Sequence, residues 1–98
     1  MAITARGRTE WLTMSEHKWE IRSAQLSPEY RLACAVLRRA VHDALGLFSL
    51  EKSDDEQGRD EVASAARAWI IHSEECEWYC DMVGAEPDDV INAIRSVL

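Results

Sequence analysis

The sequence predicts a small all-α protein, a bundle of about four helices that ends in a helix-turn-helix-like pair. Apolar residues recur at intervals of three and four from residue 28 onward, which is typical of amphipathic helices. Helix start and stop signals divide this region into separate segments. The 98 residues, 47% of them apolar, suit one modest core. We therefore expect an N-terminal arm, residues 1–27, followed by a single helical domain, residues 28–98.

The arm allows two interpretations. Its apolar pieces, Glu10–Met14 and Lys18–Arg22, could form two short strands or one irregular helix. As strands, they would place one set of residues on a common face, with Ser15–His17 in the turn. This set is Trp11, Thr13, Trp19 and Ile21. We favour an extended or hairpin-like arm, which must pack on the helices to be stable.

The first helix is expected from Pro28 to Leu45. Ser27 can cap its start, proline suits its first position, and Gly46 supplies a stop. Its main apolar stripe is Tyr30, Ala33, Cys34, Leu37, Val41, Ala44 and Leu45, and its second stripe is Leu32, Val36 and Ala40. Apolar residues on two faces predict the central helix of the bundle, with Arg31, Arg38 and Arg39 on a solvated side.

Residues 47–59 begin with the apolar Leu47, Phe48 and Leu50 and continue into a polar stretch that reads as a loop. Ser53 and Glu56 could form a capping box for a short turn, and Gly58 argues against an uninterrupted helix. The next helix is expected from Asp60 to His72. Its apolar face is Val62, Ala65, Ala66, Trp69 and Ile70. The small residues on this face permit close approach to the central helix.

Two further helices complete the chain. Ser73 predicts the start of a short helix, Glu74–Met82, that stops at Gly84, and the Glu86-Pro87 step starts the last helix. The residues expected on its buried side are Val90, Ile91, Ala93, Ile94, Val97 and Leu98. The two helices have a helix-turn-helix layout, in which Cys80, Val83, Ala85 and Val90 fill the angle between them.

The charge of this pair opposes DNA reading. A recognition helix presents its N-terminal residues to the DNA, and here these include Glu86, Asp88 and Asp89, with Arg95 the one basic residue of the helix. We expect a helix pair that packs in this way without binding DNA. The alternative is a transcriptional regulator that uses residues 74–97. Basic residues of the arm would then contact phosphate: Arg6, Arg8, Lys18 and Arg22.

The net charge of −7 is unevenly distributed. Residues 1–50 carry seven Lys or Arg and five Asp or Glu, a balance of +2, whereas residues 51–98 carry four and thirteen, a balance of −9. Acidic surfaces can serve solubility alone. Such asymmetry also indicates a partner with a basic surface, for example a nucleic-acid-binding protein or complex. A homodimer in which the two halves meet is a further alternative.

The expected partner-binding residues lie in the last two helices. Six acids would steer a basic partner: Glu74, Glu75, Glu77, Asp81, Asp88 and Asp89. Trp78 is the expected anchor, because tryptophan is enriched at binding hot spots, and Trp11 would join it if the arm were mobile. Trp69 is expected in the core.

No catalytic motif, cofactor site or metal site is predicted. His72, Cys76 and Cys80 have spacing that could place zinc ligands on one helix stripe, but no fourth ligand is evident, so we expect buried, reduced thiols. His17 and His42 are expected on the surface. Asp43 is expected to approach the Trp69 helix, where it would contact Arg67 or the backbone. The function expected is therefore non-enzymatic.

Two stretches, residues 31–44 and 66–87, carry a resemblance. The first ends in an Ala-Asp pair, at His42-Asp43-Ala44 in this chain, and the second holds Trp69, Cys80, Gly84 and the Glu86-Pro87 step. This pattern resembles small helical proteins of bacteriophages and prophages in proteobacteria. The resemblance implies a phage context and supplies no catalytic residues. Small acidic phage inhibitors, including anti-CRISPR proteins, are similar in charge and size.

The expected location is the cytoplasm of a bacterial host cell. The N-terminus lacks the apolar region of a signal peptide, and no apolar run approaches the roughly 20 residues needed to span a bilayer.

Overall fold

The computed structural model describes residues 10–47 and 56–98. These residues form α1 (Glu10–Thr13), α2 (Glu16–Ser23), α3 (Pro28–Leu45), α4 (Glu56–His72), α5 (Glu74–Val83), α6 (Pro87–Ala93) and a 3-10 turn, Arg95–Val97. They contain no strand, so the predicted all-α class is confirmed. None of these helices is long and apolar enough to cross a lipid bilayer.

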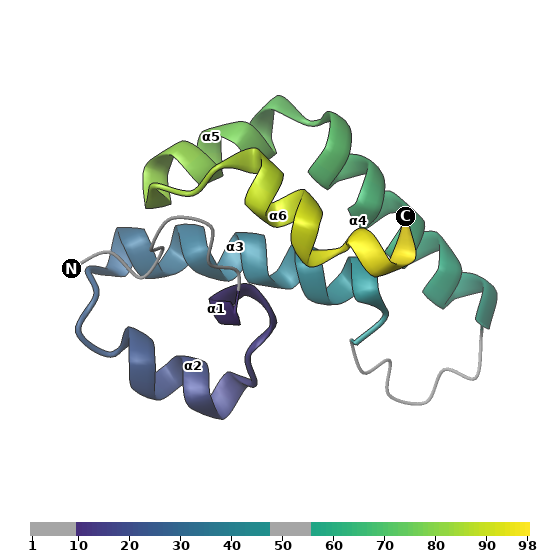
Figure 1. The fold of residues 1–98 in the computed structure, drawn as a ribbon. Coiled ribbons are helices and arrows are strands. Elements are labelled where there is room, and N and C mark those ends of the chain that lie inside the picture. Colours follow the sequence, from purple (N-terminus) through teal and green to yellow (C-terminus); the bar gives the residue numbers. More distant parts are fainter. Residues whose placement is uncertain (1–9, 48–55) are drawn as a thin grey trace.

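The long helix α3 is central, as predicted. It packs against α1, α4, α5 and α6, and Figure 1 shows it between the α5–α6 pair and the N-terminal helices. The Ser27 hydroxyl accepts a hydrogen bond from the Tyr30 amide at 3.3 Å, and Pro28 occupies the first turn. Gly46 ends the helix with φ of 74°, a left-handed conformation that glycine adopts without strain. The predicted boundaries of this helix are therefore correct.

The hairpin favoured for the arm is wrong within residues 10–23, which form α1 and α2. Trp11 and Leu12 are adjacent and both buried, which the alternating faces of a strand would not allow. Ser15 begins α2 by accepting a hydrogen bond from the Lys18 amide. Trp19 is also in the core, and its ring lies 6.0 Å from that of Trp11. Residues 1–9 of the arm lie outside the described residues.

Helix α4 starts earlier than predicted, at Glu56, and continues through Gly58. An interior glycine costs a helix about 1 kcal/mol relative to alanine, which packing of the rest of the helix on α3 can offset. The capping box expected from Ser53, and the apolar residues Phe48 and Leu50, fall outside the described residues.

Helices α5 and α6 form the expected pair. Ser73 accepts a hydrogen bond from the Glu75 amide at 3.0 Å, and Gly84 ends α5 with φ of 76°. Cys80, Val83 and Val90 are fully buried between the helices and α3.

The expected buried side of the last helix is only partly correct. Val90 and Ile94 are in the core, whereas Val97 and Leu98 are 37% and 60% exposed. The reason is that α6 ends at Ala93 and the chain then turns through Arg95–Val97, which carries the last two apolar side chains away from the core.

Candidate functional site: the acidic face of α5

The surface around Trp78 is built by one helix. Every third or fourth residue of α5 is buried against the core, namely Cys76, Cys80 and Val83. The 3.6-residue period then turns the intervening residues toward solvent. The exposed residues Glu74, Glu75, Glu77, Trp78 and Asp81 are called the acidic face below. Five of the seven predicted binding residues are thus brought together on one face.

Trp78 is exposed and yet supported. Its side chain is 59% exposed, with its ring packed edge-on against that of Tyr79 at a centroid distance of 5.0 Å. The Tyr79 ring in turn lies 6.2 Å from that of Trp69 on α4. Met82, one turn after Trp78, is 41% exposed. An aromatic row therefore links the core to an exposed apolar spot surrounded by carboxylates.

The two predicted acids of α6 differ in their roles. Asp88 is exposed, whereas Asp89 is half-buried and accepts a hydrogen bond from the Glu86 amide at 3.3 Å. The negative charges of Asp89 and Glu77 both help to raise the pKa of Cys80, after its hydrogen bond with Cys76 and its burial. Asp89 therefore has a capping role at the start of α6, whereas Asp88 is exposed to solvent.

The charge of the acidic face has no ion-pair partner among the described residues. Between Glu74 and Ala93 the chain has no Lys or Arg, and no carboxylate of the acidic face forms an ion pair within residues 10–47 and 56–98. Uncompensated carboxylates of one sign create a local negative potential that attracts basic molecules and repels nucleic acid. The chemical capacity of this surface is binding.

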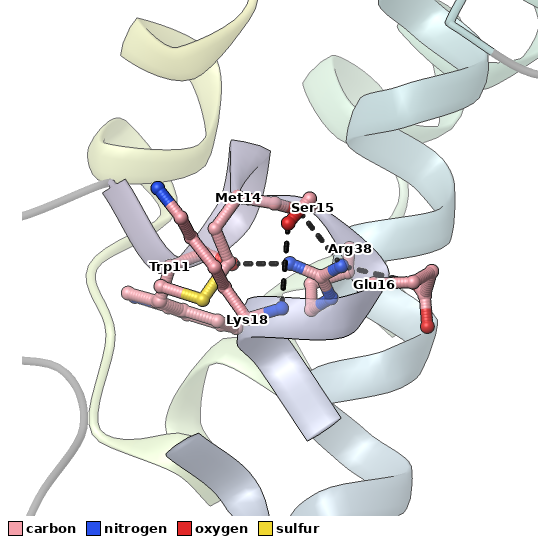
Figure 2. A network of polar contacts seen from close by, with 6 residues as sticks. All are labelled: Trp11, Met14, Ser15, Glu16, Lys18 and Arg38. Atoms are coloured by element: carbon pink, nitrogen blue, oxygen red, sulfur yellow. Dashed lines mark hydrogen bonds and ion pairs between the residues drawn. The ribbon is translucent and has the colours of Figure 1, made fainter. Parts of the chain in front are cut away.

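Arg38 was predicted to lie on the solvated side of α3. It is instead buried in the core, where it is 2% exposed. Figure 2 shows its guanidinium holding the end of α1: Nη1 donates to the Trp11 carbonyl at 2.7 Å, and Nη2 donates to the Met14 carbonyl and to Glu16 Oε1, both at 3.0 Å. Its Cζ also lies 4.8 Å from the Trp19 ring centroid. Sequence reasoning missed this because the short helix α1, whose last carbonyls need donors, was not recognised.

The polar residues near the end of α3 also differ from the prediction. His42 is half-buried, and its pKa is lowered by burial and by the Arg38 charge, whereas His17 is exposed as expected. Asp43 accepts a hydrogen bond from Arg39 at 3.4 Å, and its predicted ion pair with Arg67 does not form. Arg67 instead donates to the Ala44 carbonyl at 3.3 Å. The first contact joins two turns of α3, and the second joins α4 to α3, so both have a structural role.

The three cysteines are free and buried, as predicted. Burial raises the pKa of Cys34 to about 12. A hydrogen bond between the two thiols of α5 lowers the pKa of Cys76 and raises that of Cys80. His72 is exposed at the end of α4. The described part of the chain has no group of three or more His, Cys, Asp or Glu side chains arranged to hold a metal ion.

Trp11 does not join Trp78, because it is 1% exposed beneath α3.

Comparison of the chain with protein-family models, curated proteins and solved structures gives no match. Functional inference therefore depends on the residues themselves.

Proposed function

We propose that this chain is a non-enzymatic phage or prophage accessory protein that binds and modulates a host or phage protein bearing a basic surface. The observation that supports the proposal is Trp78, a 59% exposed tryptophan within the row of carboxylates on α5. Carboxylates at this density imitate the charge of nucleic acid, so a nucleic-acid-binding protein or complex fits this surface, as in anti-CRISPR-type inhibition.

The exposure of Trp78 indicates that the carboxylates of the acidic face serve partner binding and not solubility alone. Acidic residues alone would keep the protein soluble, and a large aromatic side chain at their centre works against that purpose. In a protein interface, by contrast, a supported tryptophan removes much apolar surface from water and loses little conformational freedom on binding. Tyr79 supplies this support.

Capture of partners from host lysate, read by mass spectrometry, tests the proposal. The triple variant Glu74→Lys, Glu77→Lys, Asp81→Lys reverses the acidic face and should lose the captured partner. A matched control reverses two Glu and one Asp that are exposed on other helices, Glu20, Glu61 and Asp60, and should retain it. If the first variant captures the same partner with the same salt dependence as the unaltered chain, the proposal is wrong.

A second candidate is a DNA-binding transcriptional regulator. The observation in its favour is the α5–α6 pair itself, with its glycine turn and buried Cys80 and Val90. Lys18 and Arg22 are exposed on α2 and could contact phosphate, while Arg6 and Arg8 lie outside the described residues. A gel-shift series at low salt separates the candidates, because failure to bind any duplex removes the regulator.

A further inference from the structure

Part of α3 stays apolar on its outer side. The sequence gives this helix a second apolar stripe, of which Leu32 is 67% exposed and Val36 and Ala40 are only half-buried. The elements packed on α3 cover its main stripe, which contains Leu37 and Val41. Within residues 10–47 and 56–98, no element therefore covers the second stripe completely.

This face continues onto α4 as an open groove. Val36 and Ala40 from α3 and Val62, Ala66 and Trp69 from α4 line a space of about 380 Å³. Alanines along the groove allow another helix to approach closely. The groove thus has the shape that helix-on-helix packing requires.

Two opposite charges lie in the groove. Arg39 and Asp43 are the ionisable residues that line it, so this face is neutral in a protein whose net charge is −7. The Arg39 side chain is 80% exposed and reaches Asp43 Oδ2 through Nε at 3.4 Å. Asp43 Oδ1 is buried and has no hydrogen-bond partner among the described residues. Among the described residues, Asp43 is therefore only partly hydrogen-bonded, while Arg39 is largely solvated.

We propose that a second copy of this chain covers the groove, related by a two-fold axis near Ala40. In such an isologous contact, both copies use the same surface, and each pair of contacting residues occurs twice. Arg39 of each copy then faces Asp43 of the other. A purely basic or purely acidic partner would pair with one of these charges and oppose the other. A two-fold copy pairs with both, and it covers the exposed apolar stripe at the same time.

The dimensions of the face agree with a modest dimer interface. Helices α3 and α4 have 18 and 17 residues, and at 1.5 Å per residue and roughly 10 Å per helix they present about 26 Å by 20 Å. A standard interface buries about 800 Å² of accessible surface per partner, about one eighth of the 6617 Å² of this chain. The flat footprint of the two helices is smaller than that value, so we expect a concentration-dependent dimer.

This inference does not depend on the proposed function, because the acidic face of α5 takes no part in the contact. It also differs from a head-to-tail dimer in which the basic half of one copy meets the acidic half of another.

The test is sedimentation velocity over a series of protein concentrations. Arg39→Asp places two acids on each side of the contact and Asp43→Arg places two bases there, so each single variant should be monomeric where the unaltered chain is dimeric. The double variant Arg39→Asp, Asp43→Arg keeps the two charges but exchanges them, and it should dimerise again.

Two controls make the result decisive. Arg22→Asp, at an exposed position of α2, changes the net charge as Arg39→Asp does and should leave the dimer intact. The reversed acidic face, Glu74→Lys with Glu77→Lys and Asp81→Lys, should also leave it intact. A chain that is monomeric at every concentration, a dimer that survives both single variants, a double variant that stays monomeric, or a dimer lost in either control would overturn the inference.

Discussion

Arg38 shows how one charged residue can hold two elements together. A guanidinium removed from water is costly unless its N–H groups are all bonded and its charge is balanced. Here two backbone carbonyls and the Glu16 carboxylate accept three hydrogen bonds, the carboxylate also balances the charge, and the Trp19 ring lies beside the guanidinium. Since Glu16 is 75% exposed, its ion pair is screened by solvent, and the buried carbonyl bonds contribute more.

The substitution Arg38→Met is expected to lower the free energy of unfolding by about 2–4 kcal/mol, because it leaves the Trp11 and Met14 carbonyls without their donor. Urea unfolding followed by tryptophan fluorescence measures this change. Arg31→Met, at an exposed position of the same helix, is the control and should change stability by less than about 0.5 kcal/mol. Equal effects of the two variants would show that the buried network is not stabilising.

The buried thiol of Cys34 should make the stability of the fold depend on pH in the alkaline range. Burial raises its folded-state pKa from 9.0 to about 12, so between these values the folded chain keeps a proton that the unfolded chain releases. Stability is therefore fully present below pH 9 and falls as the pH rises toward 12. Urea midpoints across this range should fall less steeply in Cys34→Ala. The slope that remains is expected from Cys80, whose pKa is also raised. An unchanged slope would contradict this assignment.

At the scale of elements, the helices with strong terminal signals were predictable. Ser27, Pro28 and Gly46 set the ends of α3, and Ser73 and Gly84 set those of α5, because these residues satisfy the free backbone groups locally. For α1 and α2 the helical interpretation was kept only as the alternative to strands, since their apolar residues fit two periodicities and burial in the core decides between them. The start of α4 was missed because packing overrides the cost of Gly58.

The turn between α5 and α6 requires a left-handed backbone conformation at Gly84. Its φ of 76° lies in the left-handed region, which costs an alanine roughly 1–2 kcal/mol, so Gly84→Ala should lower the free energy of unfolding by about that amount. Gly84→Asn should lower it less, since asparagine tolerates this conformation. Urea unfolding of both variants checks the order. Equal losses would indicate that lost space, and not backbone conformation, is the cause.

At the scale of the whole molecule, the sequence predicts the acidic face better than the groove. Residues of the acidic face are neighbours in one helix, so helical periodicity alone places Glu74, Trp78 and Asp81 together. The groove depends on which side of α3 receives α4, and the sequence shows two apolar stripes without showing which one is covered. Tertiary packing decides that question, as it does for Arg38.

Charge and aromatic contact should act on different rate constants of partner binding. Long-range attraction steers the encounter, so reversal of Glu74, Glu77 and Asp81 should slow association with the captured basic partner by about 10-fold or more and flatten its dependence on salt. Trp78 acts only after contact, so Trp78→Ala should leave the association rate nearly unchanged and speed dissociation by roughly 30-fold, the equivalent of about 2 kcal/mol. Surface plasmon resonance at several ionic strengths measures both rates. A Trp78→Ala variant that alters association alone, or a charge-reversed variant that keeps its salt dependence, would contradict this division of roles.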